Sequence, residues 1–165
     1  MLFRSTSPIP RRITFFSGCC FVYAATRCAI SVFPGEEPYQ DDGGFAAFLA
    51  EQSAVTCLLA DGRVAGYYIL HPNNIGRCGH VANASFAMSP AFRGRGLGKH
   101  LVARAVEQAR ELGFRGLQFN AVVVGNHAAV HLYQSAGFQT VGVIPGGFRL
   151  KDGTYSDMLV MYLSL

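Results

Sequence analysis

The sequence lacks the features that mark several common classes of protein. Its five cysteines include no C-x-x-C pair, and no cluster of cysteine and histidine has the spacing of zinc ligands. An odd, scattered set of thiols fits a reducing compartment better than a disulfide framework, so we expect a cytoplasmic protein without a metal site. The net charge of +4 is mild and is not gathered into a block, which gives no reason to expect a nucleic-acid partner.

The chain also has little that could enter a membrane. Arg11 and Arg12 precede a largely apolar run, and residues 16–19 resemble a lipoprotein cleavage box. Arg27 interrupts the run after about 13 residues, which is too short to span a bilayer. We therefore expect no membrane partner and expect residues 1–30 to supply a first strand and helix. A signal segment or a poorly ordered start is the alternative.

What the sequence does have is enough apolar material for one sizeable core. Half of the 165 residues are apolar, and no repeat or low-complexity tract divides the chain. We expect a single domain over residues 1–165, in which residues 1–30 are a divergent N-terminal segment.

Apolar periodicity and turn residues predict alternating strands and helices. Strands are expected at residues 54–60, 63–71, 80–88, 117–124, 140–144 and 155–163, and helices at residues 45–51, 97–112 and 126–136. Asp61 and Gly62 predict a type I′ hairpin turn. Residues 145–154, which include two adjacent glycines, are expected to form a loop able to close over a site. The order of elements indicates a mixed α/β sheet flanked by helices.

A glycine-rich turn before the long helix is the first candidate for chemistry. It reads Arg93-Gly94-Arg95-Gly96-Leu97-Gly98-Lys99. The first N–H groups of a helix have no partner within it, and the helix dipole adds partial positive charge, so the turn suits phosphate. The turn is neither G-x-G-x-x-G nor a Walker sequence, because Lys99 replaces the third glycine and His100 replaces Ser or Thr. It follows R-x-x-G-x-G instead; a plain turn with solvated arginines is the alternative.

A second pattern, N-x-x-A-x-x-x-Y-x-x-x-G-F, runs from Asn126 to Phe138. With these two motifs in this order, the chain resembles the GCN5-related N-acetyltransferases, well over residues 54–165 and only loosely over the first fifty. The resemblance implies a mostly antiparallel sheet that splays between two central strands. It also implies acetyl-CoA as co-substrate, no metal, and direct transfer of acetyl to a small-molecule amine. A homodimer is compatible with it.

The resemblance assigns roles to individual residues. The backbone that would pair with the pantetheine arm of the coenzyme belongs to Phe86, Ala87 and Met88. The amides from Arg93 to Lys99 would hold the pyrophosphate, and Asn126 would hydrogen-bond the pantetheine. Tyr133 would lie beside the thioester sulfur, where its O–H group can protonate the departing thiolate. A structural ring in the core is the other interpretation of Tyr133.

One position departs from the family pattern. Many members carry a glutamate, five residues before the position of Met88, that takes the proton of the amine; here that residue is Asn83. A carboxamide accepts no proton at neutral pH, so water, His80 or a largely neutral substrate must serve. His80 lies three positions from Asn83, on the opposite face of a regular strand, which favours a structural role for His80.

Asn120 lies on the strand that the family pattern places beside Asn83. Alternation puts Asn120 on the same face as Gln118 and Val122. Two interpretations are open for the asparagines: they hydrogen-bond each other across the splay, or they bind the acceptor's carboxylate or the thioester oxygen.

Residues 80–83, 118–123, 145–149 and 152–153 resemble the subgroup that acetylates azetidine-2-carboxylate and related small amino acids. That resemblance makes a small amino acid the expected acceptor. Phe148 and Arg149 would wall its site, although a plain hairpin connection is equally open. The alternatives are acetylation of a peptide N-terminus or a lysine, and a non-catalytic acyl-CoA-binding regulatory module.

Overall fold

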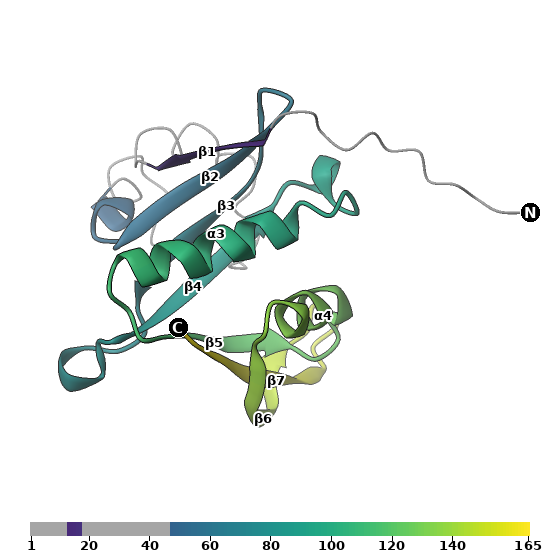
Figure 1. Ribbon diagram of the computed structural model, residues 1–165. Helices are drawn as coiled ribbons and strands as arrows, with labels where there is room; N and C mark the ends of the chain where they lie inside the picture. Colours follow the sequence, from purple (N-terminus) through teal and green to yellow (C-terminus); the bar gives the residue numbers. More distant parts are fainter. Residues whose placement is uncertain (1–12, 18–46) are drawn as a thin grey trace, which may run out of the picture.

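A computed structural model describes residues 13–17 and 47–165 (Figure 1). Its strands are β1 (Ile13–Ser17), β2 (Ala54–Ala60), β3 (Arg63–Pro72), β4 (Val81–Met88), β5 (Gly116–Val123), β6 (Gln139–Arg149) and β7 (Tyr155–Ser164). The helices are α3 (Gly98–Glu111) and α4 (His127–Ser135), the 3-10 turns are η1 (Gly76–Cys78) and η2 (Pro90–Phe92), and residues 47–50 are also helical. The expected mixed α/β architecture is confirmed.

The described strands form one sheet in the order β1-β2-β3-β4-β5-β7-β6. Only β4 and β5 run parallel; the other neighbouring pairs of the described sheet are antiparallel. β1 pairs with β2, so the N-terminal segment contributes the expected strand. The helix expected within residues 1–30 lies outside the described residues, and the expectation of one domain over the whole chain stays a prediction.

The hairpin of β2 and β3 has the predicted turn. Asp61 and Gly62 both have positive φ angles, 53° and 74°, as a type I′ turn requires. Behind the turn, the two strands contribute side chains to both faces of the sheet. One face packs against α3, and the other packs against the helical residues 47–50, where Leu49 is fully buried.

Helix α3 covers the β3 and β4 half of the sheet (Figure 1). Its buried side chains recur at the predicted spacing of three and four residues: Leu101, Val102, Ala105, Val106 and Ala109. Gln108 on the same helix adds two hydrogen bonds to the sheet. Its Oε1 accepts from the Tyr68 hydroxyl at 2.6 Å and from the Thr56 hydroxyl at 3.1 Å. Both hydroxyl-bearing residues are fully buried, so this acceptor satisfies groups that water cannot reach.

Two β-bulges make parts of the sequence interpretation wrong. β6 continues through Pro145 to Arg149, because a bulge between Ile144 and Phe148 accommodates the proline and both glycines within the strand. The expected loop over residues 145–154 is therefore only the short connection after Arg149. In β5, a bulge between Phe119 and Val122 turns Val122 into the core beside Phe119, so Val122 does not share the face of Gln118 as alternation predicted.

Replacing Gln108 by methionine should lower the free energy of unfolding by about 1–3 kcal/mol, because the side-chain volume is kept while the acceptor for two buried hydroxyls is lost. Urea unfolding measures the change. Arg104→Gln is the matched control on the same helix: its ion pairs with Glu107 and Glu111 are at the surface, and their loss should cost little. Equal stability of Gln108→Met and the unmodified protein would show that these two hydrogen bonds contribute nothing to the free energy of unfolding.

Candidate active site

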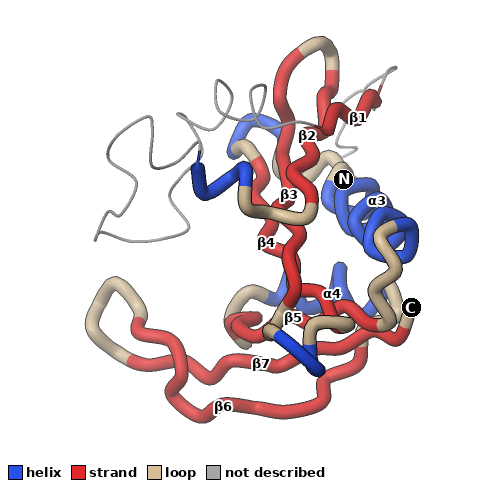
Figure 2. Tube along the Cα trace, turned by 90° about the vertical axis from the view of Figure 1, so that its left-hand side faces the viewer, coloured by secondary structure: helices blue, strands red, loops and turns tan. Residues whose placement is uncertain are grey.

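The site is organised by the separation of β4 from β5. The two strands pair only from Val81 with Gly116 to Asn83 with Gln118. Beyond these residues they diverge, and Figure 2 shows the strands of the β1–β4 half running at a steep angle to those of the β5–β7 half. The expected splay between two central strands is confirmed.

The separation leaves one edge of β4 without a strand partner. From residue 84 to Met88, β4 pairs with β3 on one side, but among the described residues no strand pairs with it on the other. This segment contains Phe86 and Ala87, to which the family resemblance assigns the contact with pantetheine. Unpaired N–H and C=O groups along such an edge can hydrogen-bond an extended polar chain as a further strand would.

The glycine-rich turn brings the start of α3 to the end of this edge. Gly94 and Gly96 have φ angles of 72° and 71°, a left-handed conformation that glycine adopts without steric cost. A Cβ atom built on either would meet nothing within 4 Å, so the side of the turn they present is open. α3 begins with no side-chain cap and no acidic residue in its first turn. The first amides of the helix are thus left for an anion.

The two arginines of the turn differ in what they offer. The N–H group of Arg93 donates to the carbonyl of Pro90 at 3.3 Å, so it is already used within η2. The guanidinium of Arg95 lies 3.3 Å from Asp61 and over the ring of Phe92, with 5.1 Å between its Cζ and the ring centroid. These contacts direct the Arg95 side chain toward the β2–β3 hairpin.

Helix α4 lies close to the turn because of Gly98. A Cβ atom at Gly98 would be only 3.0 Å from Cδ2 of Leu132, so glycine allows the two helices to approach. Asn126 caps α4, its Oδ1 accepting from the N–H of Ala129 at 3.2 Å. Its Nδ2 is the part of the side chain left for a ligand such as pantetheine.

Tyr133 projects from α4 into a cluster of aromatic rings between the two halves of the sheet. Its ring centroid lies 4.5 Å from that of Phe119, 6.1 Å from that of Phe86 and 6.0 Å from that of Phe138. Burial raises the pKa of Tyr133 to about 12, because the phenolate would lose its hydration there. The hydroxyl therefore keeps its proton at neutral pH and is suited to donate it.

Four carboxamides gather where the strands begin to separate, and we call them the amide group: Asn73, Asn83, Gln118 and Asn120. Nδ2 of Asn120 donates to Oδ1 of Asn73 at 2.6 Å, and Nδ2 of Asn83 donates to the same atom at 3.3 Å. Nε2 of Gln118 donates to Oδ1 of Asn120 at 2.7 Å. The structure thus brings Asn83 and Asn120 together, but through Asn73 and not directly.

Asn73 was missed because it lies in the turn after β3, where asparagine is common for local reasons. Its only sequence signal is its place next to the end of a strand that pairs with β4.

The amide group and Tyr133 lie on opposite faces of the sheet. Ala82 and Ala84, on either side of Asn83 in β4, belong to the core under α3, so the Asn83 side chain points to the other face. Tyr133 packs against that same core under α3. The region where β4 and β5 have separated is therefore bordered by a proton donor on one face and by carboxamides on the other.

The two histidines near Asn83 are placed differently. His80 is exposed, with Nδ1 3.1 Å from the carbonyl of Arg77, and it makes no hydrogen bond to the amide group. His71 is paired with Asn83 across β3 and β4, so it shares the face of the amide group. Nδ1 of His71 lies 2.9 Å from the carbonyl of Pro72, and donation there leaves Nε2 as the acceptor.

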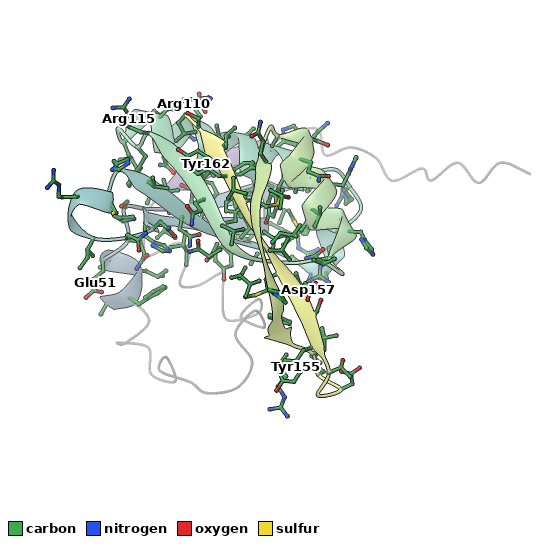
Figure 3. All side chains as sticks on the ribbon, turned by 90° about the horizontal axis from the view of Figure 1, so that it is seen from below. Glu51, Arg110, Arg115, Tyr155, Asp157 and Tyr162 are labelled. Atoms are coloured by element: carbon green, nitrogen blue, oxygen red, sulfur yellow. The ribbon has the colours of Figure 1, made fainter. Side chains whose placement is uncertain are left out.

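Phe148 and Arg149 are not joined to the amide group by any hydrogen bond or ring contact in the structure. They pair with Ser156 and Tyr155 near the end of the β6–β7 hairpin. β7 extends past Met158, the partner of the last residue of β5, and Figure 3 shows Tyr155 at the projecting end, beyond Asp157. A role for this pair in the acceptor site stays a prediction.

Residues 13–17 and 47–165, which the structure describes, contain no helix that is long and apolar enough to cross a bilayer. Nor do three or more of their His, Cys, Asp or Glu side chains come together where they could hold a metal ion.

Comparison with known proteins places this geometry in a family. Residues 21–138 match the model of the acetyltransferase (GNAT) family, and the chain belongs to that family. A solved GCN5-related N-acetyltransferase from Kribbella flavida is 30% identical, with a TM-score of 0.75 over 93% of this chain and 98% of that one.

Three curated relatives are similar over parts of the sequence. N-acetyltransferase aca1 of Schizosaccharomyces pombe is 34% identical over 52% of this chain and 41% of its own length. The L-amino acid N-acyltransferase MnaT of Escherichia coli is 31% identical over 52% of this chain and 49% of its own length. The N-alpha-acetyltransferase RimI of Mycobacterium tuberculosis is 30% identical over 77% of this chain and 80% of its own length. The matched segment thus spans about half or less of the length of the first two relatives.

Gly96→Val should weaken the binding of coenzyme A at least tenfold, because a branched side chain would stand in the open side of the turn and strain its left-handed backbone. Calorimetric titration measures the affinity. Gly113→Val is the matched control: Gly113 follows the other end of α3, has a φ of 82° and meets nothing within 4 Å. It should lose stability but keep its affinity. Unchanged affinity in folded Gly96→Val would exclude the turn as the pyrophosphate site.

Proposed function

We propose that this chain transfers the acetyl group of acetyl-CoA to the amine of a small amino acid while both substrates are bound. The observation that carries the proposal is the arrangement around the separated strands, with protonated Tyr133 on one face and the uncharged amide group on the other. Two substrates that approach from opposite faces can meet there. The MnaT relative, named as an L-amino acid N-acyltransferase, supports this acceptor class.

The coenzyme would lie on the α3 and α4 side. The unpaired edge at Phe86, Ala87 and Met88 suits the amide groups of pantetheine, and the first amides of α3 with the turn before it suit the pyrophosphate. Bound acetyl-CoA supplies the activated acetyl group. Nδ2 of Asn126 is placed to add a hydrogen bond on the same side of the sheet.

The chain's own residues would guide the transfer. The amide group holds the acceptor so that its amine faces the thioester carbon; as the new C–N bond forms and the C–S bond breaks, Tyr133 gives its proton to the departing thiolate. Solvent returns a proton to the phenolate, and the amine loses one to solvent or a nearby base. Asn83 and Asn120 orient the acceptor and take no proton in this scheme, because carboxamides do not titrate near neutrality.

Tyr133→Phe should lower kcat about 10²-fold, the usual contribution of a positioned acid, and leave coenzyme affinity nearly unchanged. Release of free thiol measures turnover. Tyr155→Phe is the control, since that ring is exposed at the projecting hairpin. Because the pKa of Tyr133 is raised to about 12, loss of its proton should not reduce kcat below about pH 10. Equal turnover in Tyr133→Phe and the unmodified protein would remove Tyr133 from the mechanism.

The pH dependence of kcat/KM should follow the acceptor. With no carboxylate at position 83, only the fraction of the amine that is already neutral reacts, so the apparent pKa should shift between an α-amino acid and its less basic α-amide. Asn83→Ala should raise KM or lower kcat without moving that pKa. A pKa that stays fixed across acceptors would instead indicate a base on the protein, and His71→Ala and His80→Ala would then be compared.

A peptide N-terminus is the second candidate acceptor, favoured by the similarity to RimI over most of both chains. Its amine stands beside an amide carbonyl and not beside a carboxylate. A panel of amino acids, their amides and short peptides therefore separates the two candidates. Thiol release with none of them would support the non-catalytic acyl-CoA-binding module instead.

Self-association and location complete the proposal. β6 is an edge strand of the described sheet, and its hairpin exposes several apolar side chains: Val141, Val143, Ile144, Leu150 and Tyr155. Covering this surface would favour a homodimer, which the molecular mass in solution tests. The expected cytoplasmic location stays a prediction.

A further inference from the structure

Asn73 is the point at which the two separated halves of the sheet are joined on the acceptor face. Its Oδ1 accepts from Asn120 of β5 and from Asn83 of β4. Its backbone N–H donates to the carbonyl of Val81 at 2.8 Å, which fixes the turn against β4. The backbone of Asn73, from which the side chain projects, is therefore held by a contact that does not depend on Asn83 or Asn120.

We propose that Asn73 is a positioning residue that turns the amide group into a site for the carboxylate of the acceptor; this inference rests on the proposed function. A carboxamide is planar, so fixing one N–H group also fixes the directions of the other N–H and of the oxygen. By accepting from both Nδ2 atoms, Asn73 sets the planes of Asn83 and Asn120. Without it, the plane of Asn83 loses its hydrogen bond to the group and can rotate, and the plane of Asn120 keeps only the bond from Gln118.

The hydrogen bonds of the group leave N–H groups on all four side chains for a ligand, together with the oxygens of Asn83 and Gln118. Each carboxamide has two N–H groups and one oxygen. Asn83, Gln118 and Asn120 each use one N–H in the bonds described above, so every member keeps at least one. The oxygen of Asn73 accepts two of these hydrogen bonds and that of Asn120 accepts one, and the group contains no carboxylate. The remaining N–H groups, in a cluster without negative charge, can bind an anion, and hydrogen bonds to charged groups are the stronger kind.

The test compares an α-amino acid with its α-amide as acceptors for three variants. Asn73→Ala should lower kcat/KM about tenfold or more for the amino acid, equivalent to one lost charge-assisted hydrogen bond, and less for the amide. Asn73→Asp keeps an oxygen that accepts from both Nδ2 atoms. It should therefore restore kcat/KM for the α-amide acceptor to nearly the value of the unmodified protein. Asn73→Asp should not restore kcat/KM for the α-amino acid, because the charge of the new aspartate repels the carboxylate of that acceptor.

Asn74→Ala is the matched control, since Asn74 is exposed in the same turn and makes no side-chain hydrogen bond among the described residues; both acceptors should be unaffected. Equal losses for the two acceptors in Asn73→Ala, or no recovery of the amide in Asn73→Asp, would overturn the inference.

A binding measurement separates this inference from the proposed function. The amino acid is titrated by calorimetry into the full-length protein saturated with coenzyme A, which requires no turnover. Weaker binding in Asn73→Ala than in Asn74→Ala supports the inference even if no acceptor in the panel is acetylated. Equal binding in these two variants overturns it, whatever the activity of the unmodified protein.

Discussion

The end of hydrogen bonding between β4 and β5 after Asn83 and Gln118 is the constraint on which the rest of the structure depends. If the parallel pairing continued, the edge of β4 would be occupied and the two faces of the sheet would be sealed from each other. The rings of Phe86, Phe119 and Tyr133 pack where the strands diverge. This packing replaces the lost backbone hydrogen bonds with apolar contact and keeps the strands apart.

The two faces of the sheet have different electrostatic environments. On the helix side, burial raises the pKa of Tyr133 to about 12, so a neutral donor is maintained without a neighbouring charge. Amides of the glycine-rich turn and the start of α3 provide partial positive charge at the other end of the proposed coenzyme path. On the opposite face, polarity comes from carboxamides, which remain neutral at every pH near physiological. The protein can therefore offer hydrogen bonds there without a charge that must be desolvated.

Local chemistry explains what the sequence could predict. The turn at Asp61 and Gly62, the start of α3 after Gly96 and the cap at Asn126 each depend on residues close together in the chain. The role of Asn73 could not be read in the same way, because its partners Asn83 and Asn120 lie 10 and 47 positions away. Nor could the bulges in β5 and β6, since a bulge is set by which side chains the neighbouring strand and the core accept. Alternation thus placed Asn120 correctly with Gln118 and misplaced Val122.

The asparagine at position 83, where the family resemblance implies a glutamate, follows the same electrostatic logic. A carboxylate at this position would help to remove the proton of the amine, but it would also stand beside the carboxylate of an amino-acid acceptor and repel it. The interaction would be strong because both charges would lie between partly buried strands. A carboxamide removes the repulsion and adds a donor, and its neighbours Asn73 and Asn120 extend the same chemistry across the separation. Under the proposed function, the absence of a base at position 83 and the presence of a carboxylate site are two consequences of the same residue, and the acceptor amine must already be neutral when it reacts.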